Sequence, residues 1–345
     1  MRILSVKYAL PGGVVTNQDL LDELGERISG RVETDTRSSI LRALETKLQY
    51  IGARMRHHRE GDERAIDFGL AAGREAIAAA GLEPEAIDLL LFVGVGRGFI
   101  EPATANVFQA ELGCHRATCF DVLDACASWL RGVDIAGHYL QCGTIRHALI
   151  INCEFNFREY ANWNIKSLED LETAWSVFTI GEAATATVLG PGSGADTFHT
   201  RFRTVGQDYH LCQIPLPNLD QFHPVAPGEG YPALKFFSNP SQLTSRAVGM
   251  LADLFNGDPA FKEADHDTIL THSASTRTSV AGIRSVGLDA ARLHDAFPRF
   301  GNTVSASLPL GMASAIEEGV LERGQRVLML MGSAGISAGI STFIY

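Results

Sequence analysis

The sequence lacks the features that mark membrane, nucleic-acid-binding and secreted proteins. Its net charge of −11 gives no reason to expect nucleic acid or an anionic membrane surface as a partner. The most apolar run, residues 89–96, is far too short to cross a bilayer. The N-terminal residues lack the long apolar core of a signal peptide, and no low-complexity segment is present. We therefore expect a cytoplasmic protein with no membrane span and no nucleic-acid partner.

The cysteines also lack a pattern. None of the six stands in a C-x-x-C pair or in another spacing typical of metal ligands. This absence predicts reduced thiols and no metal site. The six positions are Cys114, Cys119, Cys126, Cys142, Cys153 and Cys212.

The chain has 345 residues, of which 46% are hydrophobic, enough for two domains or one large duplicated one. The Pro-Gly-Ser-Gly stretch at 191–194 is the best candidate for a boundary, so we predict an N-terminal half at 1–190 and a C-terminal half at 191–345. Periodicity predicts strands at 3–10, 89–95, 117–122, 147–153, 183–189, 268–271, 325–331 and 339–345. It predicts helices at 17–24, 63–80, 104–112, 126–142, 241–256, 276–286 and 305–322.

Three segments do not fit this alternation. Residues 26–60 are polar and rich in arginine, and are expected to form a solvated helical excursion rather than core. Residues 154–182 are polar and aromatic, as in an inserted cap or loop region. Residues 205–240 are rich in proline with little periodicity, which predicts a long loop that shapes the mouth of a pocket.

Cys126 lies where a buried strand turns into an apolar helix. The free N–H groups and the positive end of the helix dipole at such a turn favour a thiolate over a thiol. Cys126 is therefore a candidate nucleophile, although a small buried structural cysteine has the same local pattern.

The sequence also indicates one internal repeat. A helix, a glycine and an apolar strand follow one another around Gly143 and again around Gly324. Counting back from each glycine by the same interval gives Cys126 and Ser307, so we expect these two positions to correspond.

Three further elements are candidates to act with Cys126. His272 follows a short apolar strand, where side chains reach the carboxyl edge of a sheet. Asn302 stands in Gly-Asn-Thr immediately before the helix of the second repeat. The turn Gly332-Ser-Ala-Gly335 follows the buried strand predicted at 325–331, and can present main-chain N–H groups to an oxyanion.

Together these motifs resemble the thiolase superfamily, and within it the ketoacyl-ACP synthase III branch. Phe-Asp-Val-x-x-Ala-Cys126, His272-Ser-Ala-Ser and Gly-Asn302-Thr-x-x-Ala-Ser match its three active-site motifs in order and spacing, as does Gly52-Ala-Arg-x-Arg-His near the start. The resemblance implies an α/β protein with a five-layered αβαβα fold of two similar halves, and an obligate homodimer. It also implies pantetheine thioesters as substrates, on acyl carrier protein or CoA, and no cofactor.

The resemblance also implies a role for each residue. Cys126 would take an acyl group as an enzyme thioester, with the N–H groups of Cys126 and Gly335 as its oxyanion hole. His272 and Asn302 would hydrogen-bond the carbonyl of a second thioester and stabilise its enolate. Arg277 matches an arginine near the pantetheine entrance, and an ordinary surface arginine is the alternative.

The chain departs from this branch in three places. Ser273 and Ser275 replace a glutamine and an asparagine. Thr46 and Tyr50 stand where the family has the tryptophan and arginine that clamp the CoA adenine, which leaves room for carrier-protein donors. Glu101, upstream of the cysteine motif, replaces a phenylalanine that closes the acyl pocket of the partner subunit.

Glu101 resembles the glutamate of head-to-head condensing enzymes of olefin synthesis and of α-pyrone-forming ketosynthases, where it acts as a base in the partner's active site. A carboxylate in an acyl tunnel is costly unless it is used, and desolvation raises the pKa of such a group toward that of a base. The alternative is a solvated loop glutamate that precedes a helix.

The main hypothesis is a Claisen condensation of two acyl thioesters, giving a β-keto acid or an α-pyrone. The alternatives are a conventional synthase III that decarboxylates a malonyl thioester, an acyltransferase that uses an alcohol or amine, and a non-catalytic partner subunit. The intact Cys126, His272 and Asn302 argue against the last of these.

Overall fold

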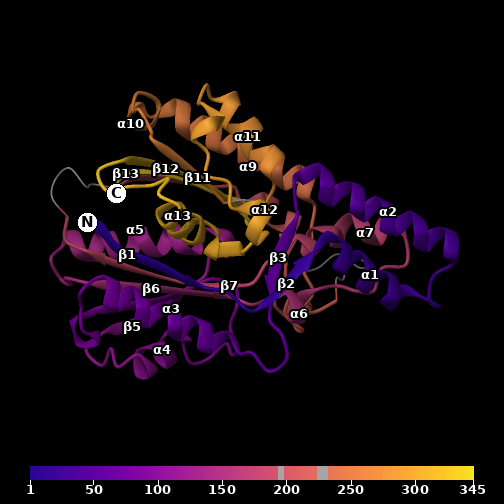
Figure 1. Ribbon diagram of the computed structural model, residues 1–345, viewed down its shortest axis with the longest axis horizontal. Coiled ribbons are helices and arrows are strands. Elements are labelled where there is room, and N and C mark those ends of the chain that lie inside the picture. Colours follow the sequence, from indigo (N-terminus) through magenta and orange to yellow (C-terminus); the bar gives the residue numbers. More distant parts are fainter. Residues whose placement is uncertain (193–197, 224–231, 273) are drawn as a thin grey trace.

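The computed structural model describes residues 1–192, 198–223, 232–272 and 274–345 (Figure 1). The predicted boundary at 191–194 therefore lies partly outside the described residues, as do residues 224–231 of the predicted long loop and Ser273. Among the helices of the described ranges, none is both long and apolar enough to cross a membrane.

The first sheet is built from strands that all lie within the predicted N-terminal half, in the order β1-β7-β6-β4-β5. Its strands are β1 (Arg2–Ala9), β4 (Leu89–Val93), β5 (Thr118–Val122), β6 (Ala148–Glu154) and β7 (Ala183–Gly190). β4 runs parallel to β5 and β6, and β7 runs antiparallel to β6 and β1. Every residue of β4 is buried, as its unbroken apolar run predicted for a strand covered on both faces.

The second sheet has the order β11-β12-β13-β8 and uses only later residues. Its strands are β8 (His199–Thr204), β11 (Thr268–Thr271), β12 (Arg326–Ser333) and β13 (Ser337–Ile344). β11 and β12 are parallel, as β4 and β6 are in the first sheet, and the other two pairs are antiparallel.

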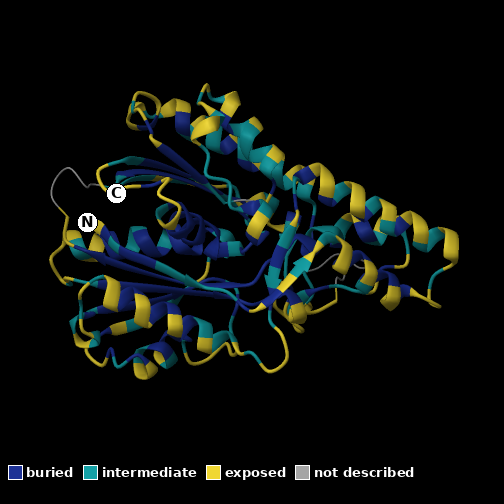
Figure 2. Ribbon diagram, viewed as in Figure 1, coloured by how far each residue is buried: buried dark blue, intermediate teal, exposed yellow. Residues whose placement is uncertain are grey.

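The helices complete five layers (Figure 1). Between the sheets lie α5 (Ser128–Gln141) and α13 (Ser307–Glu317), whose apolar side chains form one core with both sheets. Outside the first sheet lie α3 (Ala65–Ala79) and α4 (Ala105–Glu111), and outside the second lie α9 (Pro240–Gly257), α10 (Pro259–Lys262) and α11 (Thr276–Ser285). Figure 2 shows the two middle helices as the most buried of these. The predicted αβαβα layering is confirmed.

The two halves repeat one another with a constant offset in numbering. Leu89 and Thr268 begin β4 and β11, Ala148 and Val327 are their sheet partners, and Ser128 and Ser307 begin α5 and α13. Before each middle helix lies one 3₁₀ turn, η2 (Ala125–Ala127) or η7 (Val304–Ala306). By the same offset, Cys126 corresponds to Ser305.

The predicted correspondence of Cys126 with Ser307 was wrong. The count assumed that Gly143 and Gly324 end equivalent helices. Gly143 does follow α5, but α13 ends at Glu317 and its terminating glycine is Gly319, with φ +69°. Gly324 belongs to the turn that leads into β12, so the distance from it does not locate the start of the helix.

A smaller helical region projects from one end of the layers (Figure 1). It contains α1 (Asn17–Ile28), α2 (Thr34–Ile51), α6 (Phe157–Tyr160) and α7 (Leu168–Ala174), beside the antiparallel pair of β2 (Gly13–Thr16) and β3 (Met55–His58). The prediction that residues 26–60 are solvated was wrong for one face of α2. Ile40, Leu44 and Leu48 are fully buried against α1 and the 157–180 segment, because their spacing of four puts them on one side of the helix.

The remaining elements are short. They are α8 (Leu219–Phe222), α12 (Phe297–Phe300), β9 (Cys212–Gln213), β10 (Phe237–Ser238), η1 (Pro84–Ala86), η3 (Trp175–Thr179), η5 (Gly206–Leu211) and η6 (Ala290–Arg292). β9 and β10 pair with each other inside the 205–240 segment, so its described part is more ordered than the predicted loop.

Candidate active site

Cys126 lies in η2, at the turn between the edge strand β5 and the central helix α5. Ala125 before it has φ +46°, a left-handed conformation that costs a non-glycine residue about 1–2 kcal/mol. The second half holds this turn in place. The Ala127 N–H donates to Ser333 Oγ at 3.2 Å, and the Ser333 hydroxyl donates to the Asp124 carbonyl at 2.9 Å. The turn around Cys126 is thus tied to the second half of the chain through Ser333.

The surroundings of Cys126 differ from the sequence expectation. Burial raises the pKa of the Cys126 thiol well above its ordinary value, and the nearby Cys212, Glu154 and Asp124 raise it further. A hydrogen bond from the main chain lowers the pKa but does not outweigh them. The prediction that the helix N-terminus favours a thiolate was therefore wrong for the unliganded protein, because desolvation is the larger effect. Burial therefore favours the neutral thiol of Cys126.

His272 follows β11, and its main-chain N–H donates to the Leu330 carbonyl at 2.9 Å. Burial lowers the pKa of its ring to about 4, and a hydrogen bond with the main chain of Val304 opposes that shift. The ring is therefore neutral near pH 7. Within the part of the chain that the structure describes, Nδ1 has no hydrogen-bond partner. A neutral ring carries a single N–H, so it can donate to a carbonyl oxygen in the cavity only when that N–H is not donated to the Val304 carbonyl.

The side chain of Asn302 has a defined orientation. Its main chain bridges to the 179–181 segment, where its N–H donates to the Thr179 carbonyl at 2.8 Å and its carbonyl accepts from the Gly181 N–H at 3.0 Å. Its Oδ1 accepts from the Val304 N–H at 3.0 Å. A main-chain N–H can only donate, so the amide oxygen must face the turn. The Nδ2 group is left to donate into the cavity.

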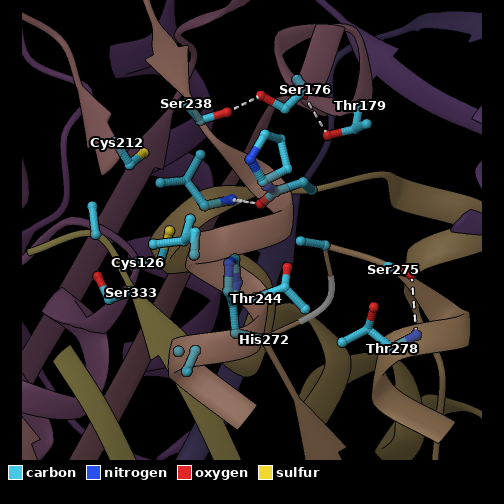
Figure 3. A pocket seen from close by; sticks show the side chains of 18 of the residues that line it. Cys126, Ser176, Thr179, Cys212, Ser238, Thr244, His272, Ser275, Thr278 and Ser333 are labelled. Carbon is cyan, nitrogen blue, oxygen red and sulfur yellow. Dashed lines mark hydrogen bonds between the residues drawn. The ribbon is translucent and has the colours of Figure 1, made fainter. Parts of the chain in front are cut away.

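These three residues line one cavity of about 780 Å³ (Figure 3). Much of its wall is apolar and comes from α9, α11 and the residue that follows α11, including Leu243, Ala247, Leu251, Phe255, Ile283 and Val286. The 205–240 segment also contributes to the wall, with Cys212, Ile214, Phe236 and Ser238. A mostly apolar cavity with a few converging polar groups is typical of a site for a largely apolar ligand.

Several polar residues in or beside the cavity were not predicted from the sequence. Figure 3 shows Cys212 beside Cys126 in the cavity, and burial raises the pKa of the Cys212 thiol to about 12. Asn156 and Tyr160 also face the cavity, and the buried Glu154 lies next to it. Only Glu154 carried a signal in the sequence, as a charged residue at the end of an apolar strand.

Within one chain, the structure does not bring Glu101 to Cys126. Glu101 is exposed in the loop between β4 and α4 and is not among the residues that line the cavity. Its neighbours Phe99 and Ile100 are exposed as well, Ile100 by 74%. Leu123, just after the edge strand β5, both lines the cavity and is 62% exposed. One side of the cavity wall therefore lies at the surface.

The other two predicted residues lie near the cavity without lining it. Gly335 is in the turn between β12 and β13, where Ala334 beside it does line the cavity. Arg277 is exposed near the start of α11, and its guanidinium stacks on the ring of Tyr50 at 4.2 Å. Tyr50 is part of the cavity wall, so Arg277 stands at the mouth.

Comparisons with known proteins show the family to which the chain is similar. A family model described as 3-oxoacyl-[acyl-carrier-protein (ACP)] synthase III matches residues 120–206, and the model of its C-terminal part matches residues 258–344. The chain is 30% identical to the β-ketoacyl-[acyl-carrier-protein] synthase III of Symbiobacterium thermophilum over 98% of this chain and 96% of the relative. It is 27% identical to the enzyme of the same name from Methylococcus capsulatus over 100% and 98%.

Solved structures show the same fold. A variant of Xanthomonas campestris OleA superposes with a TM-score of 0.82 at 21% identity, over 100% of this chain and 98% of the other. The 3-oxoacyl-[acyl-carrier-protein] synthase III of Aquifex aeolicus superposes with a TM-score of 0.79 at 23% identity, over 100% and 99%.

Proposed function

This chain belongs to the 3-oxoacyl-[acyl-carrier-protein] synthase III family of acyl-thioester-condensing acyltransferases, and from that premise we propose that it joins two acyl thioesters head to head. Enzymes of this family use thioesters of acyl carrier protein or CoA and need no cofactor. The observation that carries the proposal is the convergence of Cys126, His272 and Asn302 on one largely apolar cavity.

In the first half-reaction, the Cys126 sulfur attacks the carbonyl carbon of the first thioester. The new carbon–sulfur bond forms as the bond to the carrier thiol breaks, and the carrier thiol leaves with the proton that Cys126 gives up. The N–H groups of Cys126 and Gly335 are proposed to stabilise the tetrahedral oxyanion. This step loads the enzyme and involves neither His272 nor Asn302 directly.

In the second half-reaction, the carbonyl of the second thioester accepts hydrogen bonds from the His272 ring and from Asn302 Nδ2. A base removes its α-proton, and the resulting enolate attacks the acyl group on Cys126. Cys126 leaves and recovers a proton, and a β-ketoacyl thioester is formed. Hydrolysis of that product gives a β-keto acid, and lactonisation of a suitable β-keto product gives an α-pyrone.

We propose Glu101 of a second copy as the base. Three features support this arrangement: β5 is the edge strand of its sheet, Leu123 after it is an exposed part of the cavity wall, and Glu101 stands in an exposed loop with apolar neighbours. A homodimer formed along this edge would cover those apolar side chains and bring the Glu101 loop of each copy to the cavity of the other.

Decarboxylative condensation with a malonyl thioester is the second candidate, because the curated relatives are named as synthases III. In that reaction the loss of CO₂ creates the carbanion and no base is needed. Intact-protein mass spectrometry with a panel of acyl thioesters, followed by product analysis with and without malonyl donors, separates the two candidates. Products formed without a malonyl donor support head-to-head condensation. If products form only when a malonyl donor is present, head-to-head condensation is contradicted.

The Glu101 assignment has its own test. Glu101→Gln is expected to acylate Cys126 but not to condense non-malonyl donors, whereas Glu111→Gln, at another exposed glutamate, should remain active. Mixing inactive Glu101→Gln with inactive Cys126→Ala should restore activity in proportion to the heterodimer, since one of its sites has both groups intact. Full activity of Glu101→Gln with every donor would return Glu101 to the role of a solvated loop residue.

A further inference from the structure

One buried carboxylate beside the cavity has no part in the proposed chemistry. Glu154 is the last residue of β6 and only 1% exposed. The four hydrogen-bond donors that Glu154 has among the described residues are all neutral. Oε1 accepts from the Val95 N–H at 3.1 Å and from the Ser305 hydroxyl, and Oε2 accepts from the Gly96 N–H at 3.0 Å and from Asn156 Nδ2.

Burying a carboxylate without a cation costs several kcal/mol unless its oxygens are well hydrogen-bonded. Burial raises the pKa of Glu154, and the four hydrogen bonds act in the opposite direction. The site therefore depends on these donors being held in place, and Glu154 in turn holds the segments that carry them. A cluster of this kind holds its donor segments firmly in place. Each hydrogen bond that is lost would leave the buried charge of Glu154 less well compensated.

Two of the segments that Glu154 joins lead to proposed active-site groups. Val95 and Gly96 begin the loop that leads to Glu101. Ser305 is in η7, shortly after Asn302 and next to Val304. The packing is close enough to require glycine at position 94, where φ is +126° and a Cβ would clash with Glu154 Oε1 and lie 2.6 Å from Ser305 Oγ.

The internal repeat shows what this cluster corresponds to. Glu154 ends β6, and Ser333 ends β12 at the equivalent position of the second half. Ser333 holds the turn around Cys126, through the Ala127 N–H and the Asp124 carbonyl. Glu154 holds the turn around Ser305, the counterpart of Cys126. Each half thus ends a central strand with a side chain that secures the turn before the middle helix of the other half.

The two turns serve different half-reactions. The turn held by Ser333 carries the nucleophile. The turn held by Glu154 carries Val304, whose N–H orients the Asn302 amide and whose main chain hydrogen-bonds the His272 ring. We propose that Glu154 is a positioning residue for condensation, holding η7 so that the His272 and Asn302 donors stay aligned. This inference rests on the proposed function and assigns one residue within it.

The test compares the two half-reactions in three variants. Glu154→Gln replaces one acceptor oxygen by an NH₂ group that cannot accept, and Ser305→Ala removes a single donor to Glu154. Both should acylate Cys126 within about 3-fold of wild type, while the condensation rate falls about 10- to 100-fold, as expected for a small misplacement of catalytic groups. Because the charge of Glu154 is one cause of the raised Cys126 pKa, its removal should not slow acylation.

Glu182→Gln is the matched control. Glu182 is also a fully buried carboxylate, and it accepts from the main-chain N–H of Arg59 at 2.7 Å and of Phe157 at 3.3 Å, but it contacts Arg59 rather than the η7 turn. Glu182→Gln should lower thermal stability without changing the ratio of condensation to acylation. That ratio is the readout that a merely structural role does not alter.

The possible results separate clearly. A wild-type ratio in both Glu154→Gln and Ser305→Ala would overturn the positioning role, and so would an equal fall of the ratio in Glu182→Gln. If Glu154→Gln does not fold, Ser305→Ala alone decides between these results. If the wild-type enzyme condenses no pair of donors, the proposed function fails and the positioning role fails with it; a condensing wild type with unaffected variants overturns only the positioning role.

Discussion

Replacing Asn302 by aspartate is the sharpest test of the oxyanion site. Aspartate has nearly the same shape as asparagine and keeps an oxygen that can accept the Val304 N–H, a bond of 3.0 Å in the structure. What changes is the other atom, which becomes an acceptor where Nδ2 was a donor. The variant therefore removes one hydrogen bond to the enolate oxygen while preserving the turn.

The size of the expected loss in turnover follows from the number of hydrogen-bond donors to the enolate oxygen. If His272 and Asn302 are the two donors, losing one costs about 100- to 1000-fold in turnover, or about 2.7–4 kcal/mol of transition-state stabilisation. Asn302→Ala should fall in this range, and it also loses the Val304 bond, worth about 1 kcal/mol of stability. The loss of turnover in Asn302→Asp should lie at or beyond the upper end of this range, because a carboxylate oxygen repels the negative charge that develops on the enolate oxygen.

The assay measures the two half-reactions separately. Intact-protein mass spectrometry follows the acyl adduct on Cys126, and product analysis follows condensation after a second thioester is added. Both Asn302 variants should form the adduct at close to the wild-type rate and then fail to consume it. Asn256→Asp, at an exposed position on α9, is the control for an added negative charge. Condensation by Asn302→Asp within about 10-fold of wild type would refute the assignment of Asn302 as a donor, since a lost oxyanion donor costs more than that.

Three further predictions concern other parts of the molecule. Cys126→Ala should form no stable adduct with an activated acyl thioester, and stoichiometric acylation of that variant would show that another residue is the nucleophile. Arg277→Ala should raise the KM for carrier-bound thioesters up to about 5-fold with little change in kcat, because one exposed ion pair with the carrier is worth at most about 1 kcal/mol; an unchanged KM would leave Arg277 an ordinary surface residue. The buried His266 has a pKa lowered to about 4, chiefly by burial, so the unfolded chain takes up its proton first as the pH falls through about 6.5 and stability is lost between that pH and about 4. In urea unfolding, His266→Leu should lose up to about 2 kcal/mol less stability than wild type between pH 7 and pH 5, and parallel losses would contradict the buried neutral state.

Much of the fold followed from local pattern. The unbroken apolar run of β4 and the short apolar strand before His272 were visible as buried strands, since side-chain periodicity is a property of neighbouring residues. The motifs around Cys126, His272 and Asn302 were recognisable because each is a short turn with its own residue pattern. Their order and spacing along the chain pointed to the family before any contact was known.

Other features depended on residues far apart in sequence. The polar composition of α2 predicted a solvated helix, but its face with Ile40, Leu44 and Leu48 is covered in part by the distant 157–180 segment. The spacing of two glycines matched Cys126 to Ser307, and only the sheet register and helix starts gave Ser305. The pKa of Cys126 followed the enclosure of the cavity rather than the helix terminus alone, because desolvation depends on everything that surrounds a group.

Local patterns in the sequence thus indicated the strands, the helices and the motif residues, and the resemblance of those motifs to a known family implied the class of the fold and the candidate catalytic roles. The tertiary structure decided how those residues are oriented: the Asn302 amide by Val304, the Cys126 turn by Ser333, and the η7 turn by Glu154. The contacts of Ser333 and Glu154 join the two halves of the chain, and no local pattern specifies which buried donor meets which acceptor across such separations.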